Sequence, residues 1–385
     1  MTTNYEAFGW IPLANGHLEI LPGGKIIFVP YNSDKIGIYD PAANVFSSLS
    51  HGKGSGMWLW RAGVLAPNGK IIFVPEDSYE IGIYDPVANV FSELTHNAGG
   101  YSTYWSAGVL APNGKIIFVP ADSDHVGIYD PVENSFSTLV HEFDSYVSIW
   151  STGVLAPDGR IIFVPLRCEK YGVYDPSTNG FSTVSHGDIF SSWFWNAGVL
   201  SANGKIIFVP FGSRNIGIYD SGSFSLQLHG YWPRSGTGFR WGTGILAPNG
   251  KVIFVPYDCD HIGIFDPVSS SFSTLLAVGG TASALWQSAV LAPNGKIIFV
   301  PYNSGVIGIY DPVANSFSTL THGMGTYRAL WGAGVLAPNG KIIFVPAQGT
   351  NSIGIYDPIL NVFSLLPIPE YIGDARYWSA GVLTV

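Results

Sequence analysis

The hydrophobic and polar positions of this chain repeat at an almost constant interval of 45 residues. The clearest element is an apolar run closed by proline, Gly-Lys-Ile-Ile-Phe-Val-Pro at residues 69–75. Its basic residue recurs eight times, in steps of 45 residues with a single step of 46, at Lys25, Lys70, Lys115, Arg160, Lys205, Lys251, Lys296 and Lys341. Such a period is typical of repeat proteins, in which each unit buries its apolar face by stacking on its neighbours.

Each unit predicts four short strands. In the unit at residues 60–104, small residues interrupt the first apolar segment, and Pro-Asn-Gly at 67–69 provides a tight hairpin turn. The second segment is continuously apolar, as in a strand buried on both faces, and Pro75 ends it. A polar loop and an Asp-Pro-Val-Ala-Asn turn separate the remaining strands. We expect strands at 60–66, 70–74, 81–84 and 90–94.

Four antiparallel strands without a helical pattern predict the blade of a β-propeller, and eight units predict an all-β, eight-bladed ring. The first-strand motif, beginning with tryptophan, also forms the last piece of the chain at 378–383. We therefore expect the C-terminal strand to complete the first blade. Residues 18–24 align with the same slot but lack the tryptophan. On this interpretation residues 25–385 form the propeller and residues 1–24 are an N-terminal arm or spare strand.

Charge and cysteine usage exclude several classes of protein. The net charge is -9 and no basic run is present, so nucleic acid is not an expected partner. No apolar stretch is long enough for a membrane-spanning helix. Cys168 and Cys259 hold the same place in units two steps apart, roughly 20 Å at ~10 Å per sheet, so we expect two free thiols. Free thiols and no visible secretory signal favour an intracellular location, with the compartment otherwise undetermined.

Two repeat families resemble this chain. The segment Tyr-Asp-Pro-Val-Ala-Asn-Val-Phe-Ser-Glu-Leu at 84–94 resembles half of a kelch repeat, with phenylalanine in place of tryptophan. The segments at 113–119 and 126–131 together are similar to the YVTN-type propeller repeat. Unlike kelch units, these end the second strand with Val-Pro instead of Gly-Gly. The resemblance implies a propeller, and it implies a non-catalytic binding scaffold, because most members of both families are of that kind.

The two ends of the strands differ in variability. The Pro-Asn-Gly and Asp-Pro turns hardly change between units, and we call the face they form the turn face. The loops after the second strand and the connections between units differ in almost every unit, and we call their face the loop face. A rigid scaffold usually binds through such loops. The candidate binding residues are Trp58, Asp77, Glu80, Asp122, Asp124, His125, Arg167, Trp193, Phe194, Arg214, Trp232, Asp258, Asp260 and His261.

Three repeated features suggest chemistry but also have structural explanations. Two Asp-x-Asp-His loops, at 122–125 and 258–261, have the ligand types of a cation site but too few of them, so we predict solvated acidic loops and no metal. Six histidines end the fourth strands, where we expect them at the outer edge of the blades, bonded to backbone groups. The eight repeated tryptophans are either buried between blades or exposed around the central channel for stacking.

No catalytic motif occurs: the chain lacks a Gly-x-Ser-x-Gly elbow, a His-Glu-x-x-His pair and a phosphate-binding glycine loop. We therefore predict a non-catalytic scaffold without cofactor that makes protein–protein contacts or self-assembles through its loop face. A carbohydrate-binding propeller, with a glycan as partner, is the first alternative. A hydrolase or lyase with a carboxylate site at the channel mouth is the second, since several blades can contribute to one site.

Overall fold

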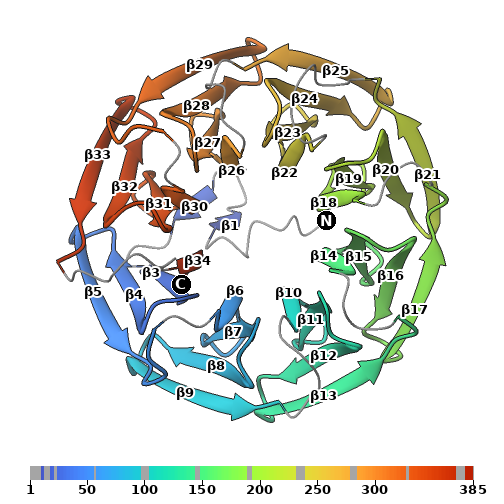
Figure 1. The fold of residues 1–385 in the computed structure, drawn as a ribbon, viewed down its shortest axis with the longest axis horizontal. Coiled ribbons are helices and arrows are strands. Elements are labelled where there is room, and N and C mark those ends of the chain that lie inside the picture. The colour runs from blue at the N-terminus through green and yellow to red at the C-terminus, as the bar shows by residue number, and fades with distance from the viewer. Residues whose placement is uncertain are drawn as a thin grey trace.

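The computed structural model describes residues 10–12, 18–20, 24–55, 58–96, 104–143, 148–188, 193–230, 239–277, 284–326, 329–369 and 378–384. Every regular element in these ranges is a β-strand. Eight four-stranded antiparallel sheets stand around one axis, which confirms the predicted eight-bladed propeller (Figure 1). None of the described residues forms a helix able to cross a membrane.

From the axis outward, each blade follows chain order. Blade 2 is β6 (Trp60–Leu65), β7 (Ile71–Pro75), β8 (Glu80–Asp85) and β9 (Val90–Thr95). Blade 3 is β10 (Trp105–Leu110), β11 (Ile116–Pro120), β12 (His125–Asp130) and β13 (Ser135–Val140). Blade 4 is β14 (Trp150–Leu155), β15 (Ile161–Pro165), β16 (Lys170–Asp175) and β17 (Gly180–Ser185). Blade 5 is β18 (Trp195–Leu200), β19 (Ile206–Pro210), β20 (Asn215–Asp220) and β21 (Ser223–Leu228).

The remaining blades repeat this order, except that blade 1 combines both ends of the chain. Blade 6 is β22 (Trp241–Leu246), β23 (Val252–Pro256), β24 (His261–Asp266) and β25 (Ser271–Leu276). Blade 7 is β26 (Trp286–Leu291), β27 (Ile297–Pro301), β28 (Val306–Asp311) and β29 (Ser316–Thr321). Blade 8 is β30 (Trp331–Leu336), β31 (Ile342–Pro346), β32 (Ser352–Asp357) and β33 (Val362–Pro367). Blade 1 is β34 (Trp378–Leu383), β3 (Ile26–Pro30), β4 (Lys35–Asp40) and β5 (Val45–Ser50).

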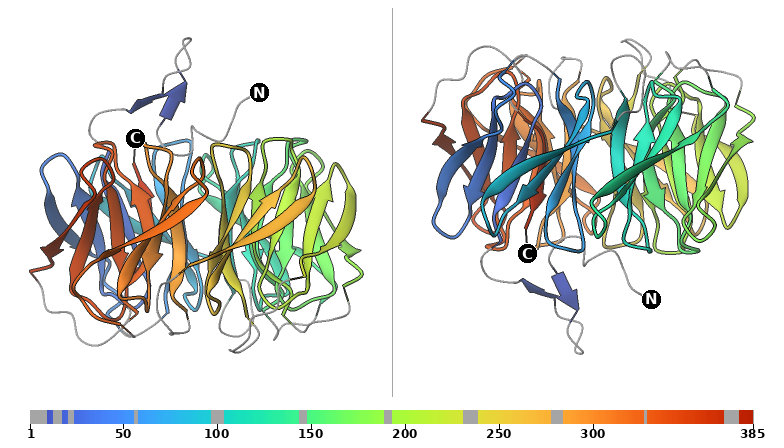
Figure 2. Two further views of the ribbon diagram at one scale, coloured as in Figure 1. Left: turned by 90° about the horizontal axis from the view of Figure 1, so that it is seen from above. Right: turned by 90° about the horizontal axis from the view of Figure 1, so that it is seen from below.

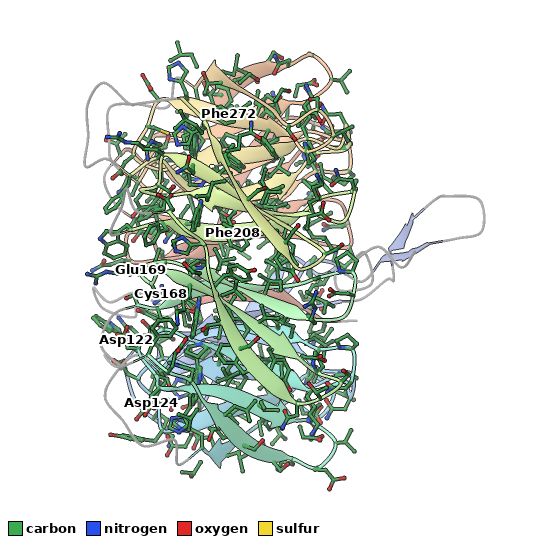
Figure 3. All side chains as sticks on the ribbon, turned by 90° about the vertical axis from the view of Figure 1, so that its right-hand side faces the viewer. Asp122, Asp124, Cys168, Glu169, Phe208 and Phe272 are labelled. Atoms are coloured by element: carbon green, nitrogen blue, oxygen red, sulfur yellow. The ribbon has the colours of Figure 1, made fainter. Side chains whose placement is uncertain are left out.

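The C-terminal strand closes the ring, as expected. β34 pairs antiparallel with β3, and this register sets Ile26 opposite Leu383 and Phe28 opposite Gly381. The competing segment pairs elsewhere, because β2 (Leu18–Ile20) forms a two-stranded hairpin with β1 (Trp10–Pro12). The hairpin projects from the face on which the C-terminus lies (Figure 2). That face is opposite the loops that carry Asp122, Asp124 and Glu169 (Figure 3).

Adjacent blades pack closely at the inner strands. A Cβ atom added at Gly63 would lie 2.7 Å from methyl carbons of Val29 and Val382, so a glycine here lets β6 approach blade 1. The eight repeated tryptophans are at most 2% exposed. Each indole N–H donates to a backbone carbonyl, as from Trp60 to Glu80 O at 2.9 Å. The tryptophans are therefore core residues, and an exposed stacking ring made of them is excluded.

The constant turn sequence locks neighbouring blades together. The side-chain amide of Asn68 donates to Pro131 O of blade 3 at 2.9 Å, and five further turns repeat this bond in their own seams. Blade 4 departs from the pattern, because Asp158 replaces the asparagine and pairs with Arg160 instead. The facing turn of blade 5 is shorter and has no proline. The donor is lost in blade 4 where the acceptor proline is lost in blade 5. We infer that the turn sequences hardly vary because neighbouring turns contact one another.

Tyr219 lacks the hydrogen bond that the equivalent tyrosines make to their turns. In six blades a tyrosine hydroxyl donates to the asparagine of its own turn, as from Tyr84 to Asn89 at 2.9 Å. The shortened turn of blade 5 lacks that asparagine. The Tyr219 hydroxyl is buried without a hydrogen-bond partner among the described residues, although Gly222 N–H lies close enough to influence its pKa. A buried hydroxyl without a partner is costly.

We expect Tyr219→Phe to leave the free energy of unfolding unchanged or to raise it, because the variant removes the costly hydroxyl. The matched substitution Tyr84→Phe should lower it by about 1 kcal/mol, because it removes a satisfied bond. Denaturant unfolding of the two variants measures the difference. Equal destabilisation of both would show that Tyr219 has a partner of similar strength.

Candidate functional site

A belt of backbone hydrogen bonds fixes the inner rim of the loop face. Within the part of the chain that the structure describes, the residue after a second-strand proline donates to the residue that precedes the tryptophan of its own blade. It also accepts from the corresponding residue of the next blade. In blade 2, Glu76 N donates to Leu59 O at 2.9 Å and Glu76 O accepts from Tyr104 N at 2.7 Å. Rigid backbone positions with different side chains are suited to hold a site.

One charged cluster of this belt lies where blades 1 and 2 meet. Tyr31 and Glu76 occupy equivalent positions in these blades, and the Tyr31 hydroxyl donates to Glu76 Oε1 at 3.2 Å. Arg61 Nη1, from the start of β6, donates to the same oxygen at 2.8 Å. At the position of Arg61 three other blades have a serine that donates to the carbonyl of the next tryptophan, and Asn196 donates to Gly242 O, one residue beyond it. Arg61 bonds to a carboxylate instead.

Glu76 has the electrostatics of an acid–base group. The residue is 3% exposed, and burial raises its pKa although Arg61 and the Tyr31 hydroxyl act in the opposite direction. Its second oxygen, Oε2, is buried and has no hydrogen-bond partner among the described residues. Buried polar atoms normally have partners, and carboxylates with perturbed pKa values are common in active sites. Among the described side chains of the belt, Glu76 thus combines a buried carboxylate oxygen that lacks a partner with a raised pKa.

Two further groups adjoin the partners of this carboxylate. Trp58 is 50% exposed, and its ring stacks on Tyr31 with centroids 6.3 Å apart and planes inclined by 15°. Asp122 of blade 3 also has a pKa raised by burial, and the cations Arg167 and Arg61 lower it in part. Arg61 is thus close enough to act electrostatically on two carboxylates, while its own side chain stays 48% exposed. The cluster combines an aromatic platform, a buried acid and a partly exposed cation.

Two of the predicted binding residues instead hold the connections between blades. Asp122 and Asp258 accept from Ser148 N and Ala284 N, and Asn303 accepts from Ala329 N in the same way. The accepting side chain in each case serves a residue with positive φ, a conformation that needs support outside glycine. Because an asparagine performs this role in blade 7, the negative charge of Asp258 is not required for it.

The two Asp-x-Asp-His loops do not form ligand clusters. Asp124 and Asp260 each bond to Nδ1 of the histidine that follows, His125 and His261. Within the ranges that the structure describes, no three His, Cys, Asp or Glu side chains are grouped as metal ligands. Each loop instead contains one neighbouring Asp–His pair.

The remaining predicted residues are dispersed around the loop face. Arg167 stacks on Trp193 at 4.7 Å, and Glu80 pairs with Lys53 at 3.3 Å. Asp77 donates its backbone N–H to Trp58 O, and Arg214 is exposed. Phe194, expected among the exposed contacts, is only 3% exposed because it packs against His186 and Trp195. Trp232 lies outside the described residues.

The candidate set missed Tyr31, Arg61 and Glu76, although the sequence contains a signal for two of them. Comparing the eight units, Arg61 is the one charged residue among those that follow the repeated tryptophan. Glu76 is likewise the one charged residue among those that follow the second-strand proline. A charged residue at a repeat position that is uncharged in all other units is a better indicator of a site than the number of acidic residues in the loops.

The histidines and cysteines of the loop face are structural. Each of the six histidines has Nε2 within hydrogen-bond distance of a backbone carbonyl of its own blade, as His51 has with Ser33 O at 2.8 Å. It also packs edge-on against the tryptophan of the next blade, so it is buried between blades and does not lie at the outer edge. Cys168 and Cys259 are buried free thiols whose pKa is raised by burial to about 12.

The histidines predict acid sensitivity. Burial lowers the pKa of all six, to about 4 for His229. Below the unfolded pKa of ~6.5 the unfolded chain binds more protons, so the free energy of unfolding falls as pH drops from there toward the folded pKa. His229 alone accounts for a loss on the order of 3 kcal/mol. The raised pKa values of Glu76 and Asp122 act in the opposite direction.

We expect the melting temperature to fall between pH 7 and pH 5, before most carboxylates titrate. His141→Gln keeps a side-chain donor for Ser123 O. It should reduce the pH dependence of the melting temperature by the contribution of this one histidine. Thermal melts of both proteins across this range measure the effect. A melting temperature that is constant over the range would contradict the assignment of neutral, buried histidines.

The fold and its rim define a β-propeller with a candidate acid–base site. No protein-family model matches the chain, and no curated protein matches it. Among solved structures, the chain is similar to virginiamycin B lyase from Staphylococcus aureus, with 14% identity, 72% of this chain and 94% of that chain covered, and a TM-score of 0.55. It is also similar to AztD from Citrobacter koseri, with 11% identity, coverages of 94% and 99%, and a TM-score of 0.63. Dihydro-heme d1 dehydrogenase NirN matches with 12% identity, coverages of 91% and 74%, and a TM-score of 0.65.

These similarities show the fold and correct two expectations. The prediction of a non-catalytic scaffold was wrong, because it assumed that propellers similar to this chain are binding scaffolds. Those that resemble it in three dimensions include a lyase and a dehydrogenase. The neighbours also do not single out the kelch family.

Proposed function

We propose that this chain is an acid–base enzyme of the lyase or hydrolase type, with its active site on the loop face where blades 1 and 2 meet. The observation that carries the proposal is Glu76, a buried carboxylate with a raised pKa and an oxygen without a partner among the described residues. The similarity to a lyase supports the proposal at the level of fold alone.

The roles of the three side chains follow from their contacts. Glu76 is the group that takes up or donates a proton through Oε2. Arg61, held by Glu76 Oε1 and partly exposed, stabilises negative charge that develops on a substrate oxygen. Tyr31 touches the same Oε1 and is a positioning residue, because its hydrogen bond fixes the plane of the carboxylate.

This arrangement suits two reactions, an elimination that consumes no water and a hydrolysis that consumes one water molecule. In an elimination, Glu76 takes a proton from a carbon beside a carbonyl, the C–H electrons form a C=C bond, and the bond to the leaving oxygen breaks. In a hydrolysis, Glu76 gives a proton to the leaving oxygen as its bond to carbon breaks, and water supplies the new hydroxyl and restores the proton. Both use one buried acid–base group beside a cation.

Product masses from a panel of lactones, esters and glycosides test the proposal. The wild-type protein should convert at least one class, and Glu76→Gln should not. Elimination leaves the summed mass of the products equal to that of the substrate, whereas hydrolysis adds one water. Turnover that persists in Glu76→Gln, or no turnover of any class by the wild-type protein, would count against the proposal.

A further inference from the structure

We propose that the substrate of this site carries an uncharged sugar ring, which stacks on Trp58 and binds Glu76 and Arg61 through its hydroxyl groups. The inference rests on the proposed function, because it takes Glu76 as the reacting group. It goes further in naming the class of ligand and in choosing hydrolysis over elimination.

The platform for the ring is Trp58. Of the large aromatic side chains described, Trp58 and Tyr79 are the strongly exposed ones, at 50% and 63%. Tyr79 packs against His96 and Tyr104, and no ring contact joins it to Tyr31 among the described residues. Trp58 stacks on Tyr31, whose hydroxyl contacts Glu76, so the platform and the acid belong to one connected cluster. The C–H face of a pyranose is a flat, apolar surface that fits an indole.

A second group of aromatic rings, Trp193, Phe211 and Phe239, is covered by other protein side chains. Arg167 covers Trp193 at 4.7 Å, and Phe239 lies parallel to Phe211 with centroids 4.3 Å apart and planes 10° apart. Phe239 also contacts Trp193 at 5.6 Å. These rings stack on one another, so they stabilise the connections of blades 4, 5 and 6 and leave Trp58 as the platform.

The polar atoms beside the platform require both a donor and an acceptor from the ligand. Glu76 Oε2 accepts a hydrogen bond from the ligand or donates its own proton, and no described residue bonds to it. Arg61 donates one amino group to Glu76 Oε1, and its half-exposed side chain presents further N–H donors. Neighbouring hydroxyls on a sugar ring supply an O–H donor and an oxygen acceptor side by side. A purely aromatic ligand has no such pair.

Charge favours an uncharged ring. The chain has a net charge of -9, and Asp77 and Asp122 are half-buried on the same rim. The positive charge of Arg61 is offset by Glu76 whenever that carboxyl group is ionised. A polyanionic ligand would therefore meet repulsion as it approached, whereas a neutral glycoside would not.

A neutral sugar lacks the acidic C–H bond that elimination needs, so this ligand class selects hydrolysis. Glu76 donates its proton to the glycosidic oxygen while the bond between that oxygen and the sugar carbon breaks. Water then forms the new bond to the carbon, and its proton returns to Glu76. A carboxylic acid whose pKa is raised by burial is the normal proton donor in such reactions.

Glycan binding by the Glu76→Gln protein tests the ligand class, because this variant keeps the shape of the site without turnover. An array of neutral and acidic glycans identifies the ligand, and titration calorimetry measures its affinity. We expect a neutral glycan to bind, with affinity about ten-fold lower when Trp58→Ala or Arg61→Ala is added. Tyr79→Ala, which removes an exposed aromatic ring of the same face, is the matched control and should leave the affinity unchanged.

The outcomes separate the ligand class from the proposed function. Binding of acidic glycans alone, or binding indifferent to Trp58→Ala, overturns the inference. So does the absence of glycan binding, including the case in which the wild-type protein turns over a lactone or ester that has no sugar, which would leave the enzyme proposal intact. Neutral glycan binding with no turnover by the wild-type protein would uphold the ligand class and overturn the enzyme proposal.

Discussion

Replacing Glu76 by glutamine is expected to lower kcat by roughly a hundred- to ten-thousand-fold, the usual contribution of a general acid or base. The amide has nearly the shape of the carboxyl group and can still contact Arg61 and the Tyr31 hydroxyl, so substrate binding should change little. Stability should hold or increase, because burying a charged carboxylate is costly while a half-exposed Arg61 can remain hydrated. Loss of rate without loss of stability is the signature of a functional residue.

Asp258→Asn is the matched control for Glu76→Gln. Asp258 lies on the same rim, but it accepts a backbone hydrogen bond that Asn303 also accepts in blade 7. We expect its kcat and melting temperature to equal those of the wild-type protein. If Glu76→Gln retained the wild-type rate, or if Asp258→Asn lost as much activity, Glu76 would not be the acid–base group.

Deleting residues 378–385 is expected to lower the melting temperature by roughly 10 °C or more. The deletion removes Trp378, which is 2% exposed, and truncating one buried tryptophan typically costs about 3–5 kcal/mol. It also removes the pairing of β34 with β3 and the packing of β34 against β6 and β30. The ring is then open at blade 1, and two blades lose their neighbour at once.

Removal of residues 1–17 provides the contrast. β2 pairs with β1 and not with β3, so this deletion leaves the closing blade intact and should change the melting temperature little. Calorimetry of the two truncated proteins gives the comparison. A larger loss from the N-terminal deletion would mean that the N-terminal segment takes part in closing the ring.

The architecture could be predicted because the signals are local and repeated. The eight Val-Pro ends, the eight tryptophans and the six Asn-Gly turns each specify a strand end, a buried position or a hairpin, and repetition removes the ambiguity of any one of them. Closure by the C-terminal strand followed from Trp378, which residues 18–24 cannot match. The burial of the tryptophans stayed open, since a regular spacing does not show which side of a strand faces a neighbouring blade.

The site was not predictable to the same degree, because it depends on contacts between blades. Tyr31 and Glu76 are 45 residues apart, and their hydrogen bond arises only when the ring brings equivalent positions side by side. Acidity of the loops was a misleading guide, since Asp122 and Asp258 accept backbone bonds in the connections. Phe194 was similarly misjudged, because the neighbour that covers it, His186, comes from the preceding blade.

The dependence of kcat/KM on pH tests the central role of Glu76 most directly. Burial raises the pKa of Glu76 and Arg61 lowers it in part, so the profile should contain a limb above the ordinary glutamate pKa of ~4.3. In Arg61→Ala that limb should move to higher pH, because the offsetting cation is gone. A profile without such a limb, or one whose limb does not move in Arg61→Ala, would contradict the assignment of Glu76 as the acid–base group.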